Sequence, residues 1–167
     1  MAWPASAPVP DGKGHLYRTD AGHLFAINRF DGQILWQYDI PGDPGHPIPG
    51  GLPVLSPNGS ICFARRSFYC IDADGKKTWR FDPDRSTEQF IAPPIFDERG
   101  TAYLFCREEH GSIYAVAADG RKKWSQDVVN TNFQYEPMKF GPDGWLWYSN
   151  FTQFVAFDVR APRGSHE

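Results

Sequence analysis

Few side chains in this sequence have the types and spacing that chemistry requires. His110 follows two carboxylates, Glu108 and Glu109, and a histidine in such a group could exchange protons near neutral pH. Calcium could use the acidic stretches at 72–75 (DADG) and 81–84 (FDPD), but neither has the spacing of an EF-hand loop. The motifs GxSxG, GxxxxGK[ST] and HExxH do not occur in the sequence. We therefore expect no catalytic residue, no cofactor and no metal ligand.

The cysteines are the other candidates for chemistry. Cys62, Cys70 and Cys106 are odd in number and irregular in spacing, which is not the pattern of a disulfide framework. All three fall in apolar, strand-like runs, so we expect buried structural thiols. The N-terminal stretch MAWPASAPVP lacks the basic and apolar regions of a signal peptide. Together these features favour a reduced, cytoplasmic location.

Composition excludes several classes of function. The 167 residues carry a net charge of -3, so no basic field for DNA or anionic lipid is expected, although Arg65 and Arg66 form a small basic cluster between Phe63 and Phe68. No apolar run reaches the roughly 18 residues of a membrane helix. The 16 glycines and 15 prolines favour many tight turns. We expect one domain over residues 1–167 that binds neither nucleic acid nor membrane.

A repeated pattern organises the chain. The stretches RFDGQILW (29–36), DADGKKTW (72–79) and AADGRKKW (117–124) each place an Asp-Gly pair before a Trp, with four residues from the Gly to the Trp. The tryptophans are 43 and 45 residues apart. A second pattern, a Pro followed by a turn with Gly, occurs four times. Its Gly lies three residues before an aromatic residue or Cys, at Tyr17, Cys62, Tyr103 and Trp147. Such periods indicate a repeat architecture.

Each repeat is expected to form four short strands. In the third repeat these are 94–96, 102–105, 112–117 and a strand around Trp124. The Asp-Gly pairs before the fourth strands suit type I′ hairpin turns. Repeats of this length with four strands each are typical of propeller blades, which bury their faces by stacking. The fold class is therefore an all-β propeller of about four four-stranded antiparallel blades, with repeats at approximately 8–50, 51–91, 92–135 and 136–160.

The stretches IYAVAADGRKKW and YCIDADGKKTW resemble the pyrroloquinoline-quinone-like (PQQ-like) repeat, the blade of quinoprotein dehydrogenases and of many non-enzymatic propellers. The resemblance covers about three and a half units, from Pro8 to Asp158. In that family the Trp docks between neighbouring blades. The resemblance therefore implies structural docking roles for the tryptophans, for the small residues beside them and for the glycines of the turns: Trp36, Trp79, Trp124, Ala26, Cys70, Ala115, Gly32, Gly75 and Gly120.

The fourth repeat lacks its outer strand, because no Trp follows FVAFD (154–158). Trp3 could supply a closing strand, although Pro4 interrupts it and the spacing to Pro8 is short. Three assemblies are compatible with this sequence: a ring of four blades, two chains joined as halves of an eight-bladed ring, or a piece of a longer propeller. We favour the homodimer, which a twofold axis closes.

The loops divide between two rims of the propeller. The short turns after the first and third strands share one rim, and the variable loops share the other, which we call the variable rim. Variable loops are where function usually lies. The candidate binding residues on this rim are Arg65, Arg66, Arg85, Arg107, Glu108, Glu109, His110, Phe133 and Tyr135. Mixed charge with aromatic residues suits a protein or peptide partner.

The sequence thus favours a non-catalytic scaffold for binding or assembly, acting through the variable rim or a central channel. One alternative is a fragment of a quinone- or metal-dependent oxidoreductase. A quinoprotein site typically includes vicinal cysteines, which this chain does not have. The other alternative is a purely structural repeat protein without a ligand.

Overall fold

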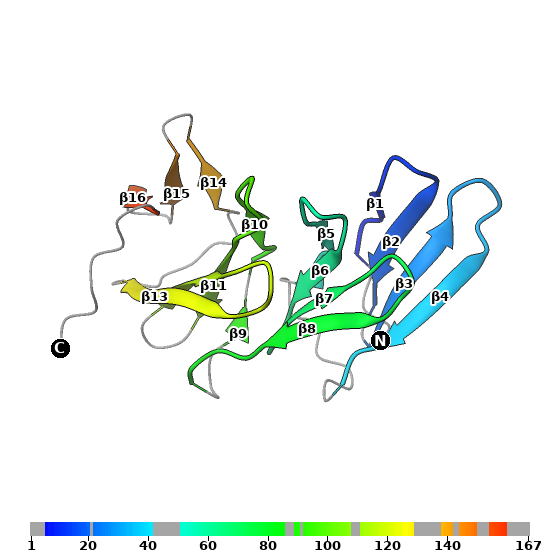
Figure 1. The fold of residues 1–167 in the computed structure, drawn as a ribbon, viewed down its shortest axis with the longest axis horizontal. Coiled ribbons are helices and arrows are strands. Elements are labelled where there is room, and N and C mark those ends of the chain that lie inside the picture. Colours follow the sequence, from blue (N-terminus) through cyan, green and yellow to red (C-terminus); the bar gives the residue numbers. More distant parts are fainter. Residues whose placement is uncertain are drawn as a thin grey trace.

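The computed structural model describes residues 6–20, 22–41, 51–85, 89–90, 92–107, 111–128, 138–141, 144–149 and 154–159. Within these ranges the regular secondary structure is β-strand, arranged as four antiparallel sheets that follow one another along the chain (Figure 1). No helix in the described ranges is long and apolar enough to span a bilayer. The predicted all-β propeller fold is confirmed.

The sheets are built from consecutive strands. The first sheet comprises β1 (Val9–Pro10), β2 (His15–Thr19), β3 (His23–Asn28) and β4 (Ile34–Asp39). The second comprises β5 (Val54–Leu55), β6 (Ile61–Ala64), β7 (Phe68–Ile71) and β8 (Lys77–Phe81). The third comprises β10 (Ile95–Phe96), β11 (Ala102–Arg107), β12 (Gly111–Val116) and β13 (Lys122–Val128), with β9 (Gln89–Phe90) also paired to β11. The fourth comprises β14 (Lys139–Phe140), β15 (Trp145–Ser149) and β16 (Phe154–Asp158).

The fourth sheet has three strands in the described part of the chain, as the sequence predicts for an incomplete last blade. The first sheet and the fourth sheet lie at opposite ends of the molecule (Figure 1), so the described sheets do not close into a ring. Trp3, the candidate for a closing strand, lies outside the described residues.

The hairpin turns differ from the predicted type. In the second sheet the amide of Gly75 donates to the carbonyl of Asp72 (3.1 Å), and the amide of Asp72 donates to the carbonyl of Lys76 (2.9 Å). The turn is therefore a three-residue loop with Gly75, at φ 82°, in the left-handed position. The prediction of two-residue type I′ turns is wrong, because Asp-Gly also suits a loop in which the Gly follows the turn rather than occupying its centre.

Strand register aligns one residue from each strand in a row across each sheet. We call this the docking row. It reads Val9, Tyr17, Ala26, Trp36 in the first sheet; Val54, Cys62, Cys70, Trp79 in the second; Ile95, Tyr103, Ala115, Trp124 in the third; and Lys139, Trp147, Ala156 in the fourth. Because successive side chains alternate between the two faces of a strand, each row marks a single face of its sheet.

Three apolar cores hold the sheets together, one between each pair of consecutive sheets. The first contains Leu24 and Ile71, the second Phe68 and Leu104, and the third Phe105 and other apolar residues of the third and fourth sheets. In each core the docking row of one sheet faces the next sheet along the chain. The side chains of the rows thus lie between blades.

Candidate interaction surfaces

The first interface between sheets is built around Trp36. A Cβ on Gly75 would lie 2.9 Å from Cδ2 of the Trp36 indole, so the ring packs directly on the backbone of that glycine. The indole Nε1 donates to the carbonyl of Ala73 (2.9 Å) in the same turn. The fourth strand of one sheet is therefore joined to the third hairpin of the next sheet by both apolar contact and a hydrogen bond.

The second interface repeats this arrangement. A Cβ on Gly120 would lie 2.9 Å from Cδ2 of Trp79. Trp124 packs against the core between the third and fourth sheets and lies 5.9 Å from the ring of Tyr103, measured between ring centroids. The structure therefore places these tryptophans at the boundaries between sheets, where the PQQ-like resemblance implies that they dock. Their energetic role stays a prediction.

The first sheet presents the same glycine without a tryptophan over it. No heavy atom within the described residues lies within 4 Å of a Cβ built on Gly32, which has φ 75°. Nearby apolar side chains are exposed: Phe30 is 82% exposed and Ile34 60%. At the other end of the molecule, Trp147 in the docking row of the fourth sheet is 39% exposed. Both ends of the stack thus expose part of an interface that is covered between the inner sheets.

The cysteines are not all thiols. Cys62 and Cys70 form a disulfide, and Cys106 is a buried free cysteine. The prediction of three thiols is wrong, because antiparallel pairing puts Cys62 directly opposite Cys70, with 4.2 Å between their Cα atoms. The repeat alignment carried this signal, since the two residues occupy the positions of Tyr17 and Ala26.

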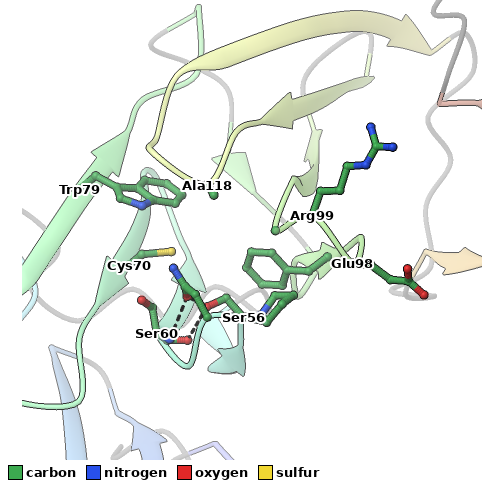
Figure 2. Close-up of a pocket in the computed structure, with 11 residues that line it drawn as sticks. Ser56, Ser60, Cys70, Trp79, Glu98, Arg99 and Ala118 are labelled. Atoms are coloured by element: carbon green, nitrogen blue, oxygen red, sulfur yellow. Dashed lines mark hydrogen bonds between the residues drawn. The ribbon is translucent and has the colours of Figure 1, made fainter.

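A cavity of about 240 Å³ opens beside this disulfide, between the second and third sheets (Figure 2). Its walls come from the short turns, which form the rim opposite the variable rim, and from the adjoining strands β7, β8 and β10. Cys70 and Trp79 line one side. Ser56, from the first turn of the second sheet, lines the cavity together with Phe96 and Arg99 of the third. Figure 2 shows the charged ends of Arg99 and Glu98 turned away from the Trp79 ring.

On the variable rim the structure separates two neighbouring arginines. Arg65 is buried, with 4% of its surface exposed, and its guanidinium donates to the carbonyl of Asp20. Arg66 is exposed. Both line a cavity of about 170 Å³ together with Tyr69 and Arg80. Arg65 is thus engaged within the protein, whereas the side chain of Arg66 is exposed to solvent.

The other residues of the variable rim lie apart or outside the described structure. Arg85 lies 3.6 Å from a carboxylate oxygen of Asp127. Glu108, Glu109, His110, Phe133 and Tyr135 lie outside the described residues, and the side chain of Arg107 does as well.

Arg80 orders part of this rim. Its guanidinium lies over the ring of Tyr69, 5.6 Å from the centroid, and donates to Asp82 (2.6 Å). Burial acts to raise the pKa of the Asp82 carboxyl, but hydrogen bonds from Ser67 and Arg80 prevail and lower it. Asp82 is therefore ionised and acts as an acceptor within the rim.

The acidic stretches considered for calcium serve the local structure. The carboxylate of Asp72 accepts the backbone amides of Asp74 (3.0 Å) and Lys76 (2.8 Å), and that of Asp84 accepts Lys122 (2.6 Å). Among the residues that the structure describes, no group of three or more His, Cys, Asp or Glu side chains could hold a metal ion.

Comparisons with known proteins agree with this architecture. Residues 20–136 match the family model described as outer membrane protein assembly factor BamB. BamB from Moraxella catarrhalis superposes with a TM-score of 0.64 and 18% identity, over 93% of this chain and 46% of that chain. A protein of unknown function from Bacteroides caccae has a TM-score of 0.59 and 13% identity, over 82% and 55%. This chain spans about half the length of these structures. No curated protein matches its sequence significantly.

Proposed function

Because the chain belongs to the PQQ-like repeat family described as outer membrane protein assembly factor BamB, we propose that it is a non-catalytic propeller module that acts as a scaffold for assembly. The observation that carries the proposal is the contrast among equivalent glycines. Gly75 and Gly120 each lie under a tryptophan of the preceding sheet, whereas a Cβ on Gly32 would meet nothing within 4 Å. A further blade packed on this face would cover Gly32 and complete the interface.

The partner that we propose is a second copy of the chain, joined through the outer faces of the first and fourth sheets. The length of the chain supports a second copy as the partner, because the chain covers 46% of the BamB structure and 55% of the other solved structure. Two copies would supply about the number of blades in one such molecule. Exposed apolar side chains at both ends of the stack, among them Ile34 and Trp147, also favour association.

Light scattering across a dilution series tests this proposal. We expect a mass near twice 18.9 kDa for the wild type. Gly32→Arg should place a long charged side chain on the outer face and shift the mass to that of a monomer. Gly59→Arg is the matched control, since Gly59 also has a positive φ and open surroundings but lies in an inner sheet. A monomeric wild type, or a Gly32→Arg variant that still dimerises, would contradict the proposal.

The variable rim is a second surface for a protein partner. Support comes from Arg66, which is exposed beside the cavity that Arg80 and Tyr69 line. Such a surface favours an acidic peptide. Fluorescence anisotropy with a labelled glutamate-rich peptide should show binding that Arg66→Glu weakens by about tenfold. Equal binding by Arg66→Glu would remove the rim from the proposal and leave end-to-end assembly untouched.

The non-catalytic part of the proposal has its own test. The alternative is an oxidoreductase fragment that binds pyrroloquinoline quinone with calcium. We expect the melting temperature to stay unchanged when both are added together. A saturable rise in melting temperature with the quinone would favour the oxidoreductase.

A further inference from the structure

We infer that the cavity between the second and third sheets is a binding site for one phenolic ring of the size of a tyrosine side chain. This inference is independent of the proposed assembly function, because the cavity lies between inner sheets and not at the ends of the stack. It rests on a comparison of the three complete docking rows, which the chain itself provides.

Two of the three rows fill the equivalent space with a tyrosine. Tyr17 pairs with Ala26 and lies 5.9 Å from the ring of Trp36, measured between centroids. Tyr103 lies at the same distance from Trp124. In both sheets the phenol ring sits over the small residue of the next strand and against the tryptophan of the fourth strand.

The second sheet has no aromatic ring at this position. Cys62 replaces the tyrosine and Cys70 replaces the alanine, and their sulfur atoms form a disulfide. Two sulfur atoms fill less space than a phenol ring. The space beside Trp79 is the cavity of about 240 Å³, and Cys70 and Trp79 both line it. For comparison, an enclosed apolar cavity of about 150 Å³ binds benzene, whereas the present cavity is larger and partly open to solvent.

The opposite wall of the cavity also matches a neighbouring blade. Tyr103 contacts Phe140 of the fourth sheet edge to face, with 5.3 Å between ring centroids. Phe96 is the equivalent residue of the third sheet, and it lines the cavity. A ring in the cavity would therefore lie between Trp79 and Phe96, as Tyr103 lies between Trp124 and Phe140.

A hydroxyl group on the ring would reach the first turn of the second sheet. The hydroxyl of Tyr103 donates to Asp97 (3.3 Å), and that of Tyr17 donates to Asp11 (3.5 Å). Ser56 is the equivalent residue of the second sheet and lines the cavity. A serine oxygen can accept a hydrogen bond from a neutral phenol.

The protonation state of Tyr103, in the third sheet, is consistent with a neutral phenol ring in the cavity. Burial and the nearby carboxylate of Asp97 raise the pKa of Tyr103 to about 12. The second sheet places the neutral Ser56 where the first and third sheets have a carboxylate. We therefore expect phenol to bind better than its ionised form, and better than an aromatic ring without a hydroxyl.

The first experiment is a titration with p-cresol, which is the tyrosine side chain without its backbone, followed by ligand-observed NMR. We expect saturable binding with a Kd of about 1 mM, and binding about three- to tenfold weaker for toluene. N-acetyltyrosinamide and the peptide Gly-Tyr-Gly separate the two sources of the ring. Tighter binding of the peptide than of p-cresol indicates a tyrosine side chain, and the reverse order indicates a free phenol.

The decisive variant is Cys62→Tyr/Cys70→Ala, which rebuilds the row of the first and third sheets. It should fill the cavity and weaken p-cresol binding at least tenfold. The matched control is Cys62→Ala/Cys70→Ala, which removes the same disulfide but leaves the space open, and it should still bind. If the filled variant does not fold, Ala118→Trp, an exposed turn residue on the cavity wall, provides the second test. Absence of saturable binding up to about 10 mM, or equal binding by the filled variant, would overturn the inference.

Discussion

The indole of Trp36 lies against the backbone of Gly75, in the next sheet, so closely that a Cβ at that glycine would be 2.9 Å from Cδ2 of the ring. Gly75 also has φ 82°, a conformation that L side chains rarely adopt. A glycine is therefore required here for two reasons: the turn needs a positive φ, and the ring of Trp36 leaves no room for a Cβ. The Trp79 and Gly120 pair has the same geometry, so the arrangement belongs to the repeat.

A comparison of Gly120→Ala with Gly59→Ala separates the requirement for a positive φ from the contact with a tryptophan. The methyl group would be strained by the positive φ and would also meet Trp79 at 2.9 Å, so we expect a loss of about 3 kcal/mol in the free energy of unfolding. Gly59→Ala has a similar φ but open surroundings, and it should cost about 1 kcal/mol. Guanidinium denaturation measures both. Equal losses would show that the tryptophan contact adds nothing.

Trp79→Ala tests the predicted docking role. Trp79 packs against the core between the second and third sheets, so its removal should cost about 3–5 kcal/mol. Trp147→Ala is the internal comparison, because this side chain is 39% exposed and faces no further sheet of the described chain; about 1 kcal/mol is expected. A small loss at Trp79, measured by thermal and chemical unfolding, would contradict docking.

The disulfide predicts one free thiol in the denatured chain. Under denaturing but non-reducing conditions, thiol titration should detect Cys106 alone. Reduction should lower the free energy of unfolding by about 2–3 kcal/mol, because the closed loop is short. Three reactive thiols in carefully oxidised protein would contradict the pairing of Cys62 and Cys70.

This disulfide also bears on the predicted cytoplasmic location. That location was inferred partly from unpaired cysteines, and disulfides persist mainly in oxidising compartments. The cytoplasmic location therefore stays a prediction.

Acid should remove a contribution of Asp11. Burial raises the pKa of this carboxyl, but hydrogen bonds from the backbone of His15 and Lys13 and from the His15 ring outweigh it and lower the pKa to about 2. A depressed carboxyl pKa stabilises the fold above its unfolded value near 4, and this stability is lost as pH falls towards 2. Urea unfolding from pH 5 to pH 2 should show a steeper loss for the wild type than for Asp11→Asn. Parallel curves would contradict this role.

Much of the fold could be predicted because the turns of successive repeats contain the same residue types at the same spacing. The glycines of the short turns and the tryptophans of the fourth strands predict the four sheets, and the last sheet has three strands in the described part of the chain. The turn type could not be predicted, since an Asp-Gly pair suits more than one hairpin loop. The repeat limits fall at or beside gaps in the described ranges and stay predictions.

The candidate sites were less predictable, because they depend on pairs of residues from different strands. Cys62 and Cys70 read separately as two apolar cysteines, and their pairing appears once the rows are aligned with Tyr17 and Ala26. The cavity has no motif of its own, since it results from a ring that is absent at one position of a repeat. Arg65 and Arg66 are neighbours in the sequence but differ in exposure. The backbone conformation of the loop sets the direction of each side chain, and it follows no regular alternation.

The separation of the apolar cores between consecutive sheets has a consequence for how the molecule unfolds. Strands pair within one sheet, and each core joins a sheet only to its neighbours, so stability is the sum of local units and their interfaces. Within the described residues, the first and fourth sheets have one covered face each, whereas the second and third have two. Opening should therefore start at the ends and travel inward. In amide hydrogen exchange, β6, β7, β11 and β12 should exchange last.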